Sequence, residues 1–147
     1  MGIARKSIYE IKTIIEDSRS KVVGGIKTGT LLWKSCVQPF LLNNCSSWLD
    51  IRKADMDKLV KLQNLFLNVL LDTYNCPASL MYFDLALLTI PNQILREKLM
   101  LYHHIHTLPD SAIAKKVLIL QKKYKFPGLQ KELESFLIKH EIVDVTK

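Results

Sequence analysis

The sequence lacks the long apolar segment of a membrane protein and the leader of a secreted one. No apolar run among its 147 residues reaches the roughly twenty that a transmembrane helix needs. The first residues are polar and basic, and no apolar stretch comes after them as in a signal peptide. We therefore expect a soluble intracellular protein, in the cytoplasm or nucleus, with no membrane partner.

The sequence is also poor in groups that bind metals or form disulfides. Its three cysteines are widely spaced along the chain: Cys36, Cys45 and Cys76. An odd, scattered set predicts buried thiols in a reducing compartment rather than a disulfide framework. No carboxylate or cysteine stands at ligand spacing from the three neighbouring histidines, so we expect no metal site at His103, His104 and His106.

Phosphate-binding and catalytic motifs are missing as well. Gly24, Gly25 and Gly29 lack both the preceding strand and the lysine-serine ending of a phosphate-binding loop. No acid pair suits two-metal chemistry, and no histidine is paired with a cysteine by a known nucleophile motif. We expect this chain alone to be no enzyme and to hold no cofactor.

The composition is that of a basic globular protein. Apolar residues make up 48% and charged residues 24%, which argues against disorder over most of the length. The 21 basic and 14 acidic residues leave a formal net charge of +7. This excess suits a polyanion such as nucleic acid, or is simply a basic surface.

The apolar pattern predicts an all-α protein, an irregular bundle of six or seven helices. A first amphipathic helix over residues 5–22 is expected to stop at Gly24-Gly25. The second, over residues 31–48, places Trp33, Phe40 and Trp48 in one stripe and is expected to kink near Pro39, which lacks an amide hydrogen.

Four or five further helices are expected from apolar spacing and from proline and glycine positions. They are expected over residues 55–71, 77–85, 91–108, 110–124 and from residue 129 onward. In the fourth of these, Ile113, Val117, Leu120 and Tyr124 are expected to point inward and Asp110 to be the N-cap. Two residues leave alternatives open. Gln63 is a satisfied peripheral amide or a bridge between helices, and Lys98 extends its amine to solvent or finds an anion.

Basic residues lie along one flank of the first predicted helix. Arg5, Lys12 and Arg19 are seven residues apart, which lines them up at intervals of about 10 Å, a spacing that could follow a phosphate backbone. The alternative is that they are solvated surface charges. The later cluster between Lys115 and Lys131 is open to the same two interpretations.

Six stretches in order resemble the carboxy-terminal part of reverse transcriptases of non-LTR retrotransposons: RKSIYEIKTIIED, VGGIKTG, LLWKSCVQPFLLNNCSSW, LVKLQNLFLNVLL, CPASLMYFDLALL and REKLMLYHHIHTL. The resemblance covers residues 4–129, and its most specific part is the series Trp33, Pro39, residues 41–44 and Trp48. The sequence departs from the family at Ala86, where glycine is frequent, and at Ser47, where glutamate often precedes the second tryptophan.

The resemblance implies a noncatalytic fragment of an RNA-directed DNA polymerase. Residues 1–50 are expected to form thumb-like helices, residues 51–141 a helical connector and residues 142–147 a tail, in one compact unit. The family's catalytic aspartates and their magnesium ions belong to a palm whose tyrosine-x-aspartate-aspartate turn this sequence lacks. Its structural anchors are expected to be Trp33, Pro39, Phe40, Trp48 and Phe66.

The thumb of such a polymerase holds RNA or an RNA–DNA duplex by its backbone, without reading bases. The expected contacts are Arg5, Lys12, Arg19, Lys21, Lys27 and Lys34. Exposed apolar surface on the first two helices would meet the palm or another protein. The alternative function is a free-standing helical protein-interaction module, such as a domesticated remnant. Loss of affinity in salt would separate nucleic-acid binding from apolar protein docking.

Overall fold

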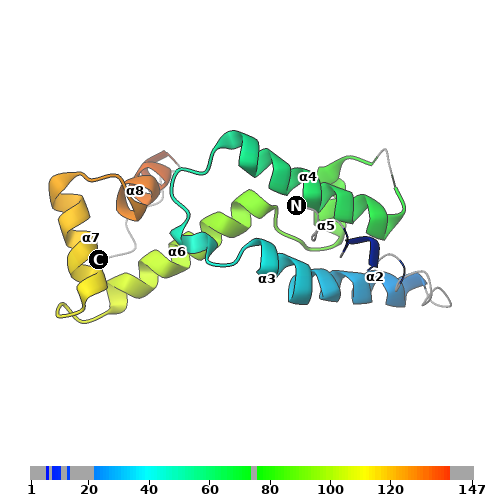
Figure 1. Ribbon diagram of the computed structural model, residues 1–147, viewed down its shortest axis with the longest axis horizontal. Helices are drawn as coiled ribbons and strands as arrows, with labels where there is room; N and C mark the ends of the chain where they lie inside the picture. Colours follow the sequence, from blue (N-terminus) through cyan, green and yellow to red (C-terminus); the bar gives the residue numbers. More distant parts are fainter. Residues whose placement is uncertain (1–5, 7, 11–12, 14–21, 74–75, 140–147) are drawn as a thin grey trace. The chain divides into compact units, whose positions relative to one another are not determined.

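The computed structural model describes residues 6, 8–10, 13, 22–73 and 76–139 (Figure 1). These residues form seven α-helices and no strand, which confirms the predicted all-α class. The helices are α2 (Val22–Leu32), α3 (Gln38–Leu41), α4 (Lys53–Leu71), α5 (Ala78–Asp84), α6 (Ile90–Thr107), α7 (Ile113–Tyr124) and α8 (Leu129–Lys139). A π-helical turn, Trp33–Val37, joins α2 to α3, and a 3-10 turn, Cys45–Ser47, comes after α3.

The chain divides into two compact units. Unit 1 comprises Met1–Asn43 and Arg52–Asn92, and unit 2 comprises Asn44–Ile51 and Gln93–Lys147. These units cut across the boundary predicted after residue 50, because α4 and α5 pack with the helix that carries Trp33. A functional division into thumb and connector at that residue stays a prediction.

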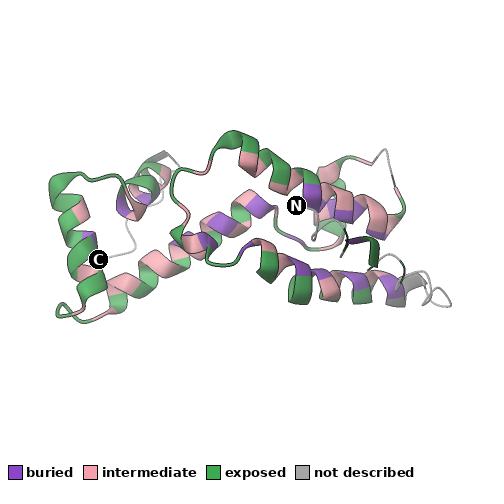
Figure 2. Ribbon diagram, in the orientation of Figure 1, coloured by how far each residue is buried: buried purple, intermediate pink, exposed green. Residues whose placement is uncertain are grey.

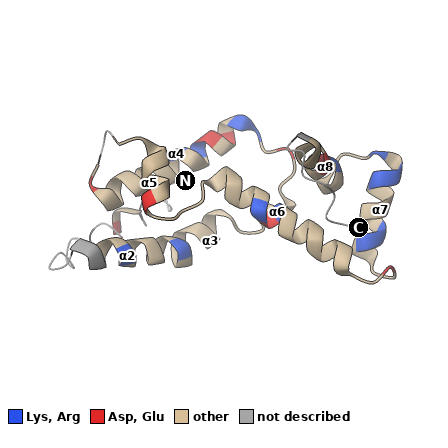
Figure 3. Ribbon diagram, turned by 180° about the vertical axis from the view of Figure 1, so that it is seen from behind, with Lys and Arg blue, Asp and Glu red and all other residues tan. Residues whose placement is uncertain are grey.

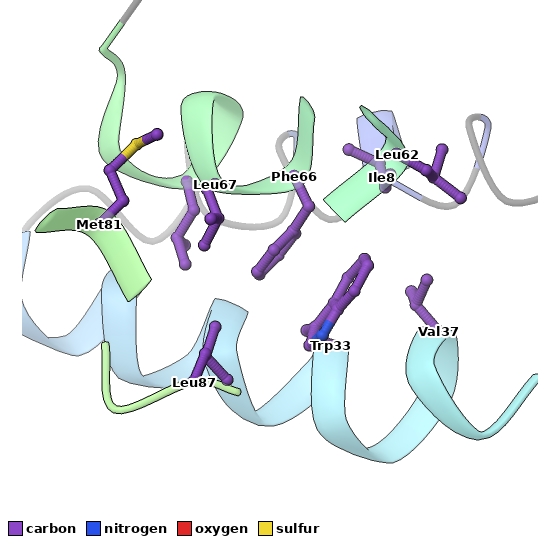
Figure 4. Packing of buried hydrophobic residues seen from close by; sticks show 9 residues of the cluster. Ile8, Trp33, Val37, Leu62, Phe66, Leu67, Met81 and Leu87 are labelled. Carbon is purple, nitrogen blue, oxygen red and sulfur yellow. The ribbon is translucent and has the colours of Figure 1, made fainter. Parts of the chain in front are cut away.

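Unit 1 has an apolar core between α2, the π turn, α4 and α5 (Figure 4). The Trp33 and Phe66 rings stack at its centre, with centroids 4.3 Å apart and planes inclined by 20°. Both rings are fully buried, which confirms these two predicted anchors. Stacked aromatic pairs add stabilisation beyond the area they bury. The buried members of this core are Ile8, Trp33, Val37, Leu62, Phe66, Leu67, Leu70, Met81 and Leu87.

Gly24 and Gly25, which were predicted to end the first helix, lie within α2. The end of the first predicted helix itself lies outside the described residues. Glycine costs a helix roughly 1 kcal/mol per residue relative to alanine, which favoured the prediction. In the structure Gly25 and Gly29 lie on the buried side of α2. Packing of this face within unit 1 therefore outweighs the local propensity.

The predicted interruption before Pro39 is present, but its form differs from a kink or break. The Gln38 amide donates to the Trp33 carbonyl across a π turn, and α-helix resumes at Gln38. Gln38 keeps helical angles, with φ −63° and ψ −47°. The wider turn absorbs the missing amide of Pro39 without breaking the rod. We refer to the continuous segment of α2, the π turn and α3, residues 22–41, as the rod.

The π turn also rotates the residues that come after it. A π turn contains more residues than an α turn, and after it the stripe of Trp33 and Val37 continues at the partly buried Leu41 and the buried Leu42. Phe40 turns outward and is 62% exposed, so its prediction as an anchor was wrong. The rod ends at Leu41, and Trp48 lies beyond the 3-10 turn, half-buried and outside the predicted stripe.

Unit 2 has a smaller apolar core and is exposed over much of α7 (Figure 2). Its buried apolar residues are Cys45, Ile94, Leu118 and Leu133. The prediction that Ile113, Val117, Leu120 and Tyr124 point inward was wrong, because α7 instead buries Leu118. Asp110 is not the N-cap of α7, a place taken by Ala112.

Candidate nucleic-acid interface

The rod carries positive charge and no negative charge. The sequence has no aspartate or glutamate between Asp17 and Asp50, so every charged residue of the rod is a lysine. These are Lys27 in α2 and Lys34 in the π turn, and both are exposed. Figure 3 shows the two as blue segments on a helix that has no red. The rod therefore presents a local positive potential that no acid of its own offsets.

Lys27 and Lys34 lie along the same flank of the rod. Residues seven apart fall about 20° from one another on an α-helix and about 10 Å apart along its axis. Among the residues that the structure describes, neither lysine forms an ion pair or a hydrogen bond. Both amines are thus free to contact phosphate groups, while Trp33 and Val37 hold the rod on the core of unit 1.

The other four predicted contacts lie outside the described residues: Arg5, Lys12, Arg19 and Lys21. Only Lys27 and Lys34 are therefore placed by the structure. Their joint position on an acid-free rod was not the reason for the prediction, which depended on the family resemblance. The spacing of the charged residues in residues 18–49 could have identified them directly.

A buried glutamine, Gln63, orders the loop between α5 and α6 in unit 1. Its Nε2 donates to the Leu88 carbonyl at 2.9 Å, and its Oε1 accepts from the Ile90 amide at 2.8 Å. Ile90 is the first residue of α6, so the side chain supplies a partner for an amide that a helix leaves unpaired. Gln63 is therefore the bridge between elements that the sequence left as one of two alternatives.

The hydroxyl of Tyr82 in α5 joins the same network. It lies 2.8 Å from Asn64 Oδ1 and 3.1 Å from Gln63 Oε1, and its proton serves one of the two. Burial raises the pKa of Tyr82 to about 12, because the phenolate is poorly solvated there. Tyr82 thus acts as a neutral donor and offers no base near neutral pH.

Helix α5 ends in a motif that requires a left-handed residue. The Leu87 amide donates to the Tyr82 carbonyl at 3.0 Å, and the Ala86 amide donates to the Phe83 carbonyl at 3.1 Å. These two bonds define a Schellman motif, whose left-handed position glycine favours. Here Ala86 takes it, with φ 47°. The sequence pattern around residue 86 did not reveal this turn.

Unit 2 resolves the alternatives left open for Lys98. Its amine is buried and donates to Glu132 Oε1 of α8 at 2.6 Å. Lys98 has therefore found an anion rather than extended into solvent. This ion pair links α8 to α6. The sequence did not predict it, because the two residues are far apart in the chain.

The histidines and cysteines lie apart from one another or from further metal ligands in the part of the chain that the structure describes. No group of three potential metal ligands occurs there, and His103 and His104 are exposed. The cysteines are free, with Cys36 exposed on the rod and Cys45 buried. Burial, and then the charge of Glu97, raise the pKa of the Cys45 thiol, which disfavours a thiolate.

Comparison with protein-family models, with curated proteins and with solved structures finds no match for this chain. Within the described ranges, no helix has both the length and the apolar character that crossing a bilayer would require. The interpretation of the rod therefore depends on its own charge, exposure and packing, together with the sequence motifs that it carries.

Proposed function

We propose that this chain is the noncatalytic carboxy-terminal, thumb-and-connector part of a non-LTR retrotransposon reverse transcriptase. In the proposal, the rod contacts the sugar-phosphate backbone of the template–primer duplex. The observation that carries it is a pair of exposed lysines, Lys27 and Lys34, which lie on one flank of an acid-free helix and have no ion-pair partner among the described residues. Phosphate contacts of this kind position a duplex without reading its sequence, as a polymerase thumb requires.

The motif at the end of α5 gives separate support to the family resemblance. Ala86 departs from the glycine that is frequent at this position in the resembled family. Its left-handed φ of 47° is the conformation for which glycine is the preferred residue. A family glycine at this position would therefore have a structural reason, and this chain retains the turn with an alanine.

Catalysis lies outside this chain in the proposal. The resembled polymerases place two magnesium ions on palm aspartates, and this sequence has no tyrosine-x-aspartate-aspartate turn. The role left to the residues present is to hold the duplex and to connect the thumb with the other domains of the polymerase. Neither role needs a cofactor bound by this chain.

The test is binding of a fluorescent RNA–DNA hybrid to the full chain, measured by anisotropy. Lys27→Glu/Lys34→Glu is compared with Lys53→Glu/Lys61→Glu, which makes the same charge change at exposed lysines of α4 in the same unit. Loss of two phosphate contacts and their replacement by acids should weaken binding by about tenfold or more. Equal weakening by both double variants would contradict a role for the rod, because net charge alone would then explain the binding.

A second candidate function is supported by apolar exposure on the rod. Leu31 is 64% exposed and Phe40 is 62% exposed, and both could contact another protein or a palm domain. The second candidate function is therefore that of a free-standing helical protein-interaction module, such as a domesticated remnant. It predicts that Leu31→Gln/Phe40→Gln leaves hybrid binding unchanged, and that wild-type hybrid binding is weak and insensitive to salt.

A further inference from the structure

Helix α7 exposes a continuous apolar stripe. Ile113, Val117, Leu120 and Tyr124 are spaced by four, three and four residues, which places them within about 60° of one another on an α-helix. Their exposed fractions are 79%, 46%, 48% and 58%. The buried residue of α7, Leu118, lies well away from them around the helix. We call these four residues the α7 stripe.

The lysines of α7 divide into two pairs that differ in their surroundings. Lys115 binds Asp110 at 2.9 Å, and Lys122 lies 3.7 Å from Glu134 of α8. These two lie on the side of Leu118 and are neutralised within unit 2. Lys116 and Lys123, also seven residues apart, flank the α7 stripe and form no ion pair within the described ranges. Lys123 lies 5.5 Å from the centroid of the Tyr124 ring.

We propose that the α7 stripe binds an amphipathic helix of another protein that carries acidic residues beside its own apolar stripe. Apolar anchors at spacings of three and four are the pattern by which one helix packs on another. Charges beside such a stripe select the partner and its orientation. One flank of the α7 stripe carries Lys116 and Lys123, and the other carries the uncharged Ala114 and Gln121. A complementary partner helix therefore carries negative charge on the one flank that faces the two lysines.

Two other occupants fit these observations less well. In an antiparallel pair of α7 helices from two copies, Lys116 and Lys123 of one would face those of the other, and like charges repel. A helix that lies on a bilayer usually has a broad apolar face. The α7 stripe is narrow, and the far side of the helix is already packed through Leu118. A single helical partner needs no wider surface.

The experiment titrates the full chain into a fluorescent designed peptide of three heptads. The peptide has leucine at the two core positions and glutamate at the two flanking positions of each heptad. A matched peptide has lysine in place of every glutamate. Vesicles of equal parts phosphatidylcholine and phosphatidylserine test the lipid surface, and sedimentation velocity tests self-association. Circular dichroism checks that each variant keeps its helical content.

The wild-type chain should bind the glutamate peptide at least tenfold more tightly than the lysine peptide, an order-of-magnitude estimate for complementary flanks. Leu120→Gln should weaken binding by about tenfold, as expected when a central anchor is lost. Ile119→Gln is the control, because Ile119 is 54% exposed on the same helix but off the stripe. It should change affinity less than about twofold.

Lys116→Glu/Lys123→Glu should reverse the preference in favour of the lysine peptide. The same double change at Lys125 and Lys131, outside α7, should not reverse it. Equal affinity for the two peptides, or equal losses from Leu120→Gln and Ile119→Gln, would overturn the proposal. The proposal would also be overturned if neither peptide binds and the chain instead binds vesicles or forms a dimer, with Leu120→Gln abolishing that interaction.

Discussion

The two units bury apolar side chains to very different extents. Unit 1 closes around the stacked rings of Trp33 and Phe66, with a buried polar network at Gln63 beside them. Unit 2 buries few apolar residues, holds α8 to α6 with a Lys98–Glu132 ion pair, and leaves the apolar stripe of α7 exposed. Unit 1 therefore encloses its largest apolar side chains, whereas unit 2 leaves exposed the stripe that we propose as a binding surface.

The largest expected effect is at the centre of unit 1. Trp33→Ala removes a fully buried ring and its stacking with Phe66, so the free energy of unfolding should fall by about 3–5 kcal/mol. Urea denaturation monitored by circular dichroism measures the change. Phe83→Ala is the control, because Phe83 is 84% exposed and its loss should cost less than about 0.5 kcal/mol. Similar losses from the two variants would contradict the described core.

The buried network of unit 1 should be nearly as sensitive. Gln63→Leu keeps the side chain's bulk but leaves the Leu88 carbonyl and the Ile90 amide without their partner, at a cost of about 2–4 kcal/mol. Tyr82→Phe removes one hydroxyl, but Gln63 Oε1 keeps its bond from the Ile90 amide and Asn64 is only partly buried, so the change should cost about 1 kcal/mol. Urea denaturation of both variants measures the two losses in the free energy of unfolding. A larger loss from Tyr82→Phe than from Gln63→Leu would contradict this assignment.

In unit 2, stability should depend on the partner of the buried Lys98. Glu132→Ala leaves the buried ammonium without its carboxylate, which should cost about 1–3 kcal/mol, since Glu132 itself is partly exposed. Lys98→Met/Glu132→Ala removes the charge together with its partner and should recover most of the loss. A double variant that is less stable than Glu132→Ala would show that the amine has another partner.

Alkaline pH should weaken unit 1 through Tyr82. Its pKa is raised to about 12 in the folded protein from an ordinary value of 10.0, so the unfolded chain loses this proton first. The stabilisation is complete below about pH 10 and is lost as the pH rises toward 12. Because the side chain is only half-buried, we expect the loss of unfolding free energy to be about 1 kcal/mol. The free energy of unfolding should therefore fall more steeply with rising pH in the wild type than in Tyr82→Phe. Parallel declines would contradict it.

The smallest effect should be an increase in stability. Ala86→Gly relieves a left-handed alanine at the end of α5 and should add about 1 kcal/mol. Ala54→Gly in the first turn of α4 is the control and should lower stability by about 0.5–1 kcal/mol, because glycine gains nothing there. If both changes destabilise the protein, the left-handed conformation at residue 86 is not the native one.

The sequence predicted the fold class and α4 well for one physical reason. Apolar residues at helical spacing cover most of α4, and a helix that is apolar on most sides must be central. Two features that the sequence predicted wrongly have different causes. Gly24 and Gly25 lie within a helix whose buried face packs in unit 1, which local propensity does not describe. The π turn accommodates the missing amide of Pro39 and places Phe40 outward, which a pattern of 100° per residue cannot foresee.

The error at α7 has a different cause. Its amphipathic pattern correctly predicted a helix with an apolar stripe, but a pattern alone cannot tell whether that stripe packs within the chain or binds a partner. The candidate interface shows the same limit of pattern. The charges of Lys27 and Lys34 were predictable from sequence. Their exposure on the rod, and the lack of an acidic partner among the described residues, became visible only in the structure.

The most direct test of the proposed backbone grip is the salt dependence of RNA–DNA hybrid binding by the wild-type chain. Contacts with about six phosphates should reduce affinity by about a thousandfold between 50 and 200 mM monovalent salt. Hybrid and duplex RNA of unrelated sequences should lose affinity in parallel, since the backbone is common to them. Affinity that is unchanged across this range would contradict the account and leave protein docking as the better explanation of the exposed surfaces.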